Sequence, residues 1–451
     1  MNLKAIAPDS AWKTWSPSGD DWNRRAAAHL YRRAGFAANS QQLTAALERS
    51  PAEIIDGWLG EGEKPEADFE RVSTSLANSV LAGGDPQKLG SWWLFRMANS
   101  PNQLIEKTTL FWHGHFATSA AKVTDARMMF NQNQMLRRYA VGDFGRMVHE
   151  ISRDPAMLLY LDSTTNRKAH PNENYARELM ELFCLGEGNY TEEDIREIAR
   201  CFTGWEIRRK KYRFNRYQHD TGDKSFLGAT GKLGGEEAVD VVLAQRTAPM
   251  FIVKKLIRYF VFDEPAVADE LAEPLANELR ANDFVLAPTI RRILTSEIFF
   301  STQSVGRKVR SPIELGVGVL RALEGSTNLN AIGNESGEIG QALFFPPNVK
   351  GWDGGRTWIN SSTLLGRANF VQRLLKHEKT RFADEGLREL TEKHKVRKPT
   401  EFVEWLEDLL LARPLRDESR RGIAETVKMN NESTLRDAVY LMSTLPEFQL
   451  S

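Results

Sequence analysis

Cysteine is scarce in this sequence, and long apolar runs are missing from it. Two cysteines, Cys184 and Cys201, occur among 451 residues, and neither has a CxxC partner. This scarcity excludes a disulfide framework and a cysteine-rich zinc site, so both thiols are expected to be buried; a bridge between them requires an oxidising compartment. No stretch approaches the roughly 18 consecutive apolar residues of a membrane-spanning helix, so we expect no membrane span.

The sequence also lacks net charge and a recognisable export signal. Lys plus Arg total 60, and Asp plus Glu total 60. This balance argues against general binding to nucleic-acid phosphates, so we expect no nucleic-acid partner. The first residues, MNLKAIAPDSAWKTWSPSGDDW, contain neither the apolar core of a signal peptide nor a twin arginine. A cytoplasmic location is therefore the default expectation.

Apolar residues recur at helical spacing in most of the chain. In TAPMFIVKKLIRYFVF, residues 247–262, apolar side chains such as Ile252, Leu256 and Phe260 are three or four residues apart, while Lys254 and Arg258 fall on the other side. Six stretches of this kind occur along the sequence. They predict a mainly α-helical, multi-helix protein.

Two segments interrupt the helical pattern. Residues 205–234 interleave aromatic and charged residues between glycines, which predicts a small β-hairpin near 205–217 followed by an ordered loop. Residues 344–370 contain a Pro-Pro and a Gly-Gly pair, which exclude a helix from the first half of a long glycine-rich loop. Such loops inside a helical body are usually functional or mobile. We expect a helical core over 1–375, and a charged linker with a small helical extension, packed on the core, over 376–451.

The stretch HPNENYARELMELFCLG, residues 170–186, predicts an amphipathic helix. At about 100 degrees per residue, Asn174, Arg177, Glu178 and Glu181 share one face, opposite an apolar face. This pattern has two interpretations. The polar face is either solvated and fixed by an ion pair between Arg177 and Glu181 at i,i+4, or it is the acidic wall of an active site.

Histidines mark two further candidate positions. In TLFWHGHFATS, His113 and His115 point about 200 degrees apart on one helix, which excludes a single helical metal site unless Gly114 ends or kinks the helix. Two core histidines are the alternative. His219 and Asp220 adjoin in a glycine-rich loop, where they form a candidate ligand pair or an oriented general base.

The basic run RRKKYRFNRY, residues 208–217, has the composition of a strip that grips phosphate or single-stranded nucleic acid. Because the whole chain is neutral, we favour an exposed hairpin with alternating faces. Among the acidic residues of DPAMLLYLDS, Asp154 indicates a helix start, and Asp162 is the better site candidate.

Several segments together resemble a bacterial family catalogued as domain of unknown function 1800. The resemblance runs in order from about residue 12 to residue 375, and LPEFQL resembles the usual end of the family. The matching stretches are WNRRAAAHLYRRAGF, TLFWHGHFATS, DPAMLLYLDSTTNRKAHPNENYARELMELFCLGEGNYTEEDIREIARCFTGW, RFNRYQHDTGDKSFLG and FFPPNVKGWDGGRTWINSSTLL.

The resemblance implies a partner. Members of this family are commonly encoded beside a sulfatase-like family, domain of unknown function 1501, that often carries twin-arginine signals. A sulfatase-like partner with such a signal would carry this chain into the periplasm already folded, as an alternative to the cytoplasm.

The resemblance also favours the active-site interpretation of residues 170–186, because a merely solvated face is not expected to define a family. We predict a metal-assisted enzyme of the hydrolase type, with a pocket of histidines and carboxylates between helices that holds Zn, Mn or Fe(II). The preferred metal ligands are His115, Glu178 and Asp220. The expected catalytic residues are Arg177, Glu181, His219 and His113.

Two alternatives stay open from the sequence. One is a non-enzymatic scaffold, or an export and assembly partner of a sulfatase-like secreted protein. A structure that places four side chains far apart favours this alternative, whereas their convergence within about 5 Å favours the enzyme; the four are His113, His115, Glu178 and His219. The other is an iron- or haem-dependent oxidoreductase, for which the sequence has no CxxCH attachment motif.

Overall fold

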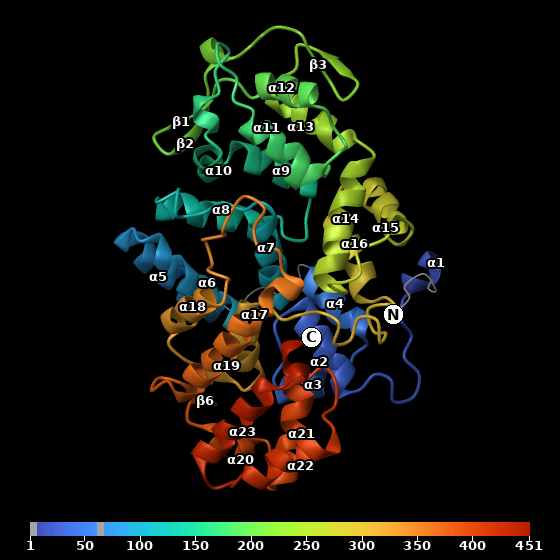
Figure 1. The fold of residues 1–451 in the computed structure, drawn as a ribbon, viewed down its shortest axis with the longest axis vertical. Helices are drawn as coiled ribbons and strands as arrows, with labels where there is room; N and C mark the ends of the chain where they lie inside the picture. Colours follow the sequence, from blue (N-terminus) through green and yellow to red (C-terminus); the bar gives the residue numbers. More distant parts are fainter. Residues whose placement is uncertain (1–6, 61–66) are drawn as a thin grey trace.

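The amphipathic segment at 247–262 forms helix α14 (Thr247–Phe260), and its apolar stripe of Ile252, Leu256 and Phe260 is fully buried. The computed structural model describes residues 7–60 and 67–451, and it confirms the predicted mainly α-helical fold (Figure 1). The signal-peptide prediction falls partly on residues 1–6, which lie outside the described residues. Within the described residues, no helix has both the length and the apolar character needed to cross a bilayer.

The helices are stacked along one long axis (Figure 1). The middle of the molecule holds α1 (Pro8–Ala11), α2 (Arg24–Ala34), α3 (Ser40–Ala46), α4 (Pro51–Leu59), α5 (Ala67–Gly83), η2 (Pro86–Lys88), α6 (Leu89–Asn99), α7 (Gln103–His115), α8 (Ala126–Arg138), α14, α15 (Asp269–Ala281), α16 (Leu286–Leu294), α17 (Pro312–Ala322) and α18 (Leu329–Glu338). The upper part holds α9 (Phe144–Arg153), α10 (Pro155–Tyr160), η3 (Ser163–Thr165), α11 (Asn174–Glu178), η4 (Leu179–Cys184), α12 (Glu192–Cys201) and α13 (Gly235–Ala244).

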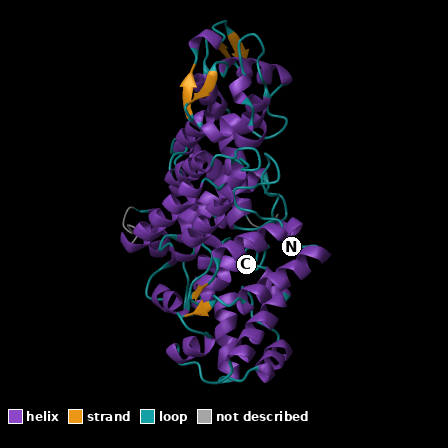
Figure 2. Cartoon of the chain, turned by 90° about the vertical axis from the view of Figure 1, so that its left-hand side faces the viewer, coloured by secondary structure: helices purple, strands orange, loops and turns teal. Residues whose placement is uncertain are grey.

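Short strands occur at the upper end of the molecule and in its lower half, above the lowest helices (Figure 2). In the upper part, β1 (Trp205–Arg208) pairs antiparallel with β2 (Lys211–Phe214), which confirms the predicted hairpin near 205–217. After η5 (Arg216–Gln218), the predicted ordered loop contains a second small hairpin, β3 (Lys224–Phe226) with β4 (Ala229–Gly231). In the lower part, β5 (Gly325–Ser326) pairs with β6 (Arg381–Phe382).

The segment after residue 338 confirms the predicted break in helical structure. It runs without regular structure to η6 (Gly355–Trp358) and then enters α19 (Ser361–Lys376). The remaining lower helices are α20 (Leu387–Lys393), α21 (Pro399–Leu410), α22 (Asp417–Thr426), α23 (Glu432–Thr444) and α24 (Pro446–Gln449). Helix α21 packs on α2 and α17, and α23 packs on α19. The division into domains at residue 375 stays a prediction.

The chain returns to the middle of the molecule at its last described residues (Figure 1). Leu450 forms a bridge with Val309, and the Ser451 backbone N–H donates to the carbonyl of Lys308 at 2.8 Å. Arg33, which is buried in α2, donates to the Ser451 carbonyl at 2.6 Å. Residues 308–310 are therefore held in place by residues far along the chain.

Helix α12 shows how local sequence fixes a helix start. The Thr191 hydroxyl accepts from the Asp194 backbone N–H at 3.2 Å, and the Asp194 carboxylate accepts from the Thr191 N–H at 2.8 Å, which is a complete capping box. We expect Thr191→Ala to lower the free energy of unfolding by about 1 kcal/mol, measured by urea denaturation. Thr426→Ala at the end of α22 is the control, expected within about 0.5 kcal/mol of the parent protein. Equal losses in the two variants would contradict this assignment.

Candidate active site

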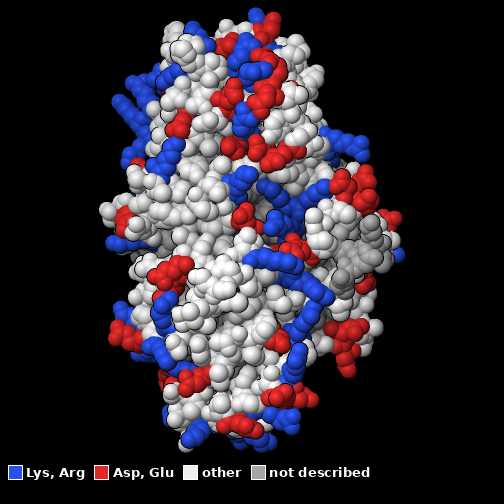
Figure 3. Space-filling model, viewed as in Figure 1, with Lys and Arg blue, Asp and Glu red and all other residues white. Residues whose placement is uncertain are grey.

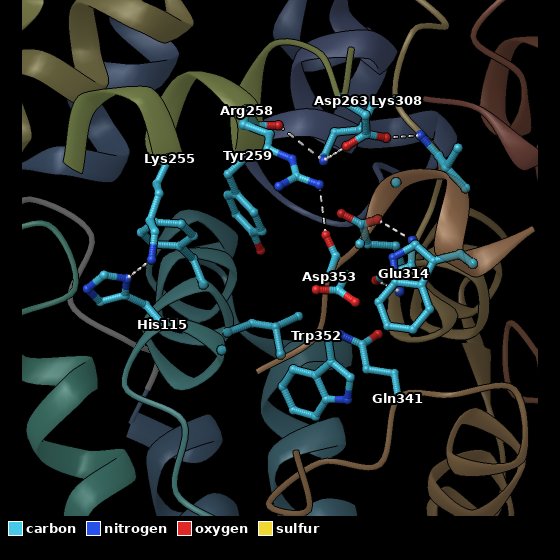
Figure 4. Close-up of a pocket in the computed structure, with 18 of the residues that line it drawn as sticks. His115, Lys255, Arg258, Tyr259, Asp263, Lys308, Glu314, Gln341, Trp352 and Asp353 are labelled. Atoms are coloured by element: carbon cyan, nitrogen blue, oxygen red, sulfur yellow. Dashed lines mark hydrogen bonds and ion pairs between the residues drawn. The ribbon is translucent and has the colours of Figure 1, made fainter. Parts of the chain in front are cut away.

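A cleft opens between α7 and α14 in the middle of the molecule, with a volume of about 230 Å³ (Figure 4). Residues three and four positions apart lie on one face of a helix. Each helix therefore presents a short row of side chains to the cleft. From α7 these are Leu110, Phe111 and His115, together with the backbone of Gly114, and from α14 they are Lys255, Arg258 and Tyr259.

The other walls come from Lys308, Glu314 at the start of α17, and the loop at 350–358. The loop approaches α7 because two glycines meet there. Gly351 has φ +77°, and a Cβ on it would lie 2.1 Å from the carbonyl oxygen of Gly114. This contact brings Trp352 onto α7, so the glycine-rich loop closes one side of the cleft.

His115 and Lys255 form a hydrogen-bonded pair at one end of the cleft (Figure 4). His115 Nε2 lies 3.0 Å from the carbonyl oxygen of Phe183, which can only accept, so Nε2 carries the proton and Nδ1 carries a lone pair. Lys255 Nζ donates to that Nδ1 at 3.0 Å and to the Leu182 carbonyl at 2.9 Å. Two of the hydrogen positions of the amine are thereby fixed.

A π-helical turn supplies the two carbonyl groups. Helix α11 continues as η4, a π turn over Leu179–Cys184, and the N–H groups of Leu185 and Gly186 both donate to Met180. The carbonyls of Leu182 and Phe183 lie at the end of the helix, where backbone acceptors lack helical partners, and they accept from Lys255 and His115 instead. Single π turns are frequent at functional sites.

Burial decides the charge states of this pair. Burial lowers the pKa of His115 well below its usual range, and the neighbouring Lys255 lowers it further, so the ring is neutral. Burial also lowers the pKa of Lys255 to about 7; Cys184 opposes this effect, and Arg258 adds to it. At neutral pH the neutral amine and the ammonium form of Lys255 are therefore present in similar amounts.

The cleft carries an excess of positive charge. Two acidic residues of the cleft are neutralised in ion pairs: Asp263 binds Lys308 at 2.6 Å, and Glu314 binds the buried Lys107. Within the described part of the chain, Lys255, Arg258 and Lys350 form no ion pair within 4 Å, and Asp353 is the only other carboxylate lining the cleft. Arg258 donates to the backbone carbonyl of Asp353 at 2.9 Å, so its charge stays available. Figure 3 shows Lys and Arg side chains gathered around a hollow in this face.

His115 is the one predicted site residue that lines this cleft. His113 points to the other side of α7, as its spacing predicted, and is buried against Trp93 and Phe344. Its Nε2 accepts from the Phe344 backbone N–H at 3.1 Å, and burial lowers its pKa to about 3. His113 therefore anchors the start of the glycine-rich loop as a neutral core residue.

The predicted ion pair between Arg177 and Glu181 is wrong. Arg177 pairs instead with Glu173 at 3.3 Å and Glu192 at 2.8 Å, while Glu181 accepts from the Tyr190 hydroxyl at 3.0 Å. The π turn begins at Leu179 and changes the rotation on which the i,i+4 projection depended. The helix predicted over residues 170–186 also starts later than expected, at Asn174.

Glu178 lies beside the cleft rather than in it. It is half-buried; burial and the neighbouring Glu181 raise the pKa of its carboxyl group, whereas Arg177 and Lys350 oppose this rise. Lys350 also lines the cleft, so its charge acts both on the cleft and on the carboxyl group of Glu178.

His219 and Asp220 contact the end of α12 and the segment that follows it, instead of the cleft. His219 Nδ1 lies 2.9 Å from the Thr203 carbonyl, and its ring packs on Phe214. Asp220 is bound by Arg200 at 2.7 Å, which holds the pKa of its carboxyl group below the usual range.

The predicted ligands His115, Glu178 and Asp220 are thus not brought together. No group of three or more His, Cys, Asp or Glu among residues 7–60 and 67–451 is arranged to hold a metal ion. Both ring nitrogens of His115 already have hydrogen-bond partners. The divalent metal stays a prediction.

Sequence reasoning missed Lys255, Arg258 and Lys308. A lysine on the polar side of an amphipathic helix is ordinarily solvated, and the periodicity of 247–262 does not distinguish Lys254, which pairs with Asp269, from Lys255. The sequence offers one weak signal: Lys255 lies about one turn before Arg258 and Tyr259 on the same helix face.

Comparison with known proteins gives one match. A family model described as "Protein of unknown function (DUF1800)" matches residues 29–450, nearly the whole chain. No curated protein and no solved structure matches it.

Proposed function

Because the chain belongs to the DUF1800 family, whose description names no activity, we propose its function from the cleft: an enzyme that acts on a small anionic molecule, with Lys255 as its reactive amine. The observation that carries the proposal is the placement of Lys255 Nζ between His115 Nδ1 and the Leu182 carbonyl, at the wall of a cationic cleft. Lys255 is only partly buried, so a small reactant has access to it.

The stereochemistry of the amine supports a chemical role. Neutral Lys255 has two N–H bonds, and both have acceptors within 3.0 Å. Its lone pair therefore takes the remaining position, free to accept a proton or to attack an electrophilic carbon. A lysine with a pKa near the working pH is suited to both tasks.

The surrounding residues set the kind of substrate. The unpaired charges of Arg258 and Lys350 favour a carboxylate or phosphate group over a neutral molecule. A volume of about 230 Å³ is smaller than the roughly 300–1,000 Å³ of pockets that bind drug-sized ligands, so the substrate is a small metabolite.

The functions expected from the sequence alone stay predictions. Metal-assisted hydrolysis at His115 requires Lys255 to leave Nδ1, because that nitrogen is the only ring position with a lone pair. No contact in the cleft supports haem or iron chemistry. The cleft likewise says nothing for a scaffold role, a sulfatase-like partner or co-export to the periplasm.

Acylation with a limiting amount of acetic anhydride tests the proposal. Because the neutral amine reacts, labelling of Lys255 should rise with pH to a midpoint near 7, whereas ordinary lysines titrate near pH 10.4. At pH 7 we expect Lys255 to react at least about tenfold faster than Lys254, its neighbour on the exposed side of α14, as read by peptide mass spectrometry.

Inorganic phosphate provides the second arm of this experiment. Phosphate should slow the labelling of Lys255 and leave the labelling of Lys254 unchanged, because Lys255 lines the cleft and Lys254 does not. If the labelling of Lys255 rose only near pH 10.4, as for an ordinary lysine, the proposed role of Lys255 would be wrong.

A further inference from the structure

We infer that Lys255 condenses with a small carbonyl compound that carries an anionic group, such as a 2-oxo carboxylate, to form an imine. This inference rests on the proposed function and deepens it. It follows from the contact of the Lys255 amine with His115 and from the position of Arg258, about one helical turn away.

The contact with His115 distinguishes imine formation from simple base catalysis. A lysine that only accepts a proton needs no second base at its own nitrogen. An amine that adds to a carbonyl must lose protons, and the neutral Nδ1 of His115, 3.0 Å away, is positioned to take them.

The steps balance as follows. The nitrogen lone pair forms the N–C bond while the π electrons of the carbonyl move to oxygen, and one amine proton passes through His115 to that oxygen. The C–O bond then breaks, the nitrogen lone pair forms the C=N bond, and the departing oxygen takes the second amine proton by the same route. The amine and the carbonyl compound thus give an imine and water, and no oxidant or reductant is required.

Neighbouring groups fit this adduct. Arg258 lies three residues beyond Lys255 on the same face of α14, and its guanidinium group extends into the cleft, where it can bind the anionic group of the carbonyl compound (Figure 4). The Phe251 ring lies 4.4 Å from Lys255 Nζ, and an aromatic face stabilises a cationic nitrogen such as that of a protonated imine.

Reductive trapping tests the inference on the full-length chain. Pyruvate with sodium cyanoborohydride near neutral pH should add the mass of pyruvic acid less one oxygen atom, and peptide mapping should place it on Lys255. Acetone, which lacks the anionic group, should be trapped about tenfold less. Because Arg258 also lowers the pKa of Lys255, trapping is compared as a ratio: Arg258→Met should lower the ratio of pyruvate to acetone trapping about tenfold, whereas Lys254→Met should leave this ratio unchanged.

The two proposals fail in different ways. If acetic anhydride labels Lys255 at neutral pH but no pyruvate adduct forms there, the imine is excluded and the reactive amine stands. An adduct spread evenly over surface lysines, or equal trapping of pyruvate and acetone, also overturns the inference. Because the adduct is mapped on the unmodified chain, the result does not depend on whether a variant folds.

Discussion

Replacing Glu106 with glutamine is expected to lower the free energy of unfolding by about 3–5 kcal/mol. The Glu106 side chain is 1% exposed and accepts hydrogen bonds from Arg96 at 2.8 Å, Arg137 at 2.9 Å and the Trp93 indole at 2.9 Å. Glutamine keeps the shape but removes the buried charge that Arg96 on α6 and Arg137 on α8 share. Urea denaturation at pH 7 measures the loss.

The loss should depend on pH in a defined direction. Burial raises the pKa of Glu106, but Arg137 and Arg96 outweigh that effect and lower it to about 2, from 4.5 in an unfolded chain. A carboxyl group with a lowered folded pKa stabilises the protein above its unfolded pKa, and this contribution disappears as the pH falls through its folded pKa. The difference between parent and Glu106→Gln should therefore be full above about pH 4.5 and shrink towards pH 2.

Glu70 is the matched control, because its side chain is 41% exposed and also binds Arg96, at 3.0 Å. We expect Glu70→Gln to lose less than about 1 kcal/mol, as exposed ion pairs do. Equal losses at the two positions would show that the burial of Glu106 has no special effect.

Replacing Gly351 with alanine is expected to lower the free energy of unfolding by about 3 kcal/mol and to displace the loop at 350–358. A left-handed alanine costs about 1–2 kcal/mol, and a Cβ placed 2.1 Å from the Gly114 carbonyl forces the backbones apart, which adds about 1–3 kcal/mol. Because Lys350 and Trp352 move with the loop, phosphate should protect Lys255 from acetic anhydride less well.

Gly354→Ala, in the same loop, separates the cost of the backbone conformation from the cost of the clash with Gly114. Gly354 has φ +72°, but the nearest atom to its Cβ position is Trp358 Nε1 at 3.8 Å. With ψ −171°, Gly354 lies in a backbone region that is nearly restricted to glycine, so this variant should lose only the conformational part, about 1–3 kcal/mol. It should keep the phosphate protection of Lys255. A Gly351→Ala protein with the stability and protection of Gly354→Ala would show that the contact with α7 is unimportant.

The fold could be predicted where short-range pattern determines structure. The apolar period of 247–262 predicted α14, and the alternation and glycines after residue 204 predicted the hairpin β1–β2. The π turn could not be predicted, because a regular helical projection assumes a constant rotation per residue. That assumption placed Arg177 next to Glu181, although the widened turn carries Glu181 towards Tyr190.

The candidate site could be predicted only in part for a related reason. His115 was recognised by its residue type within a distinctive motif. Its partner Lys255 is 140 residues away, and their contact depends on how α7, α14 and the π turn pack together. No local spacing encodes that packing.

The return of residues 449–451 to the middle of the molecule also orders events during synthesis. Arg310 donates to the carbonyl of Leu450, which follows it by 140 residues, and Lys308 and Val309 are paired with the same terminal segment. At roughly 5–20 residues per second, a ribosome needs about seven to thirty seconds to make that intervening stretch. During this interval α7 and α14 can already pack, while the cleft wall at Lys308 still lacks its support, so the cleft is completed only after residues 449–451 have been made.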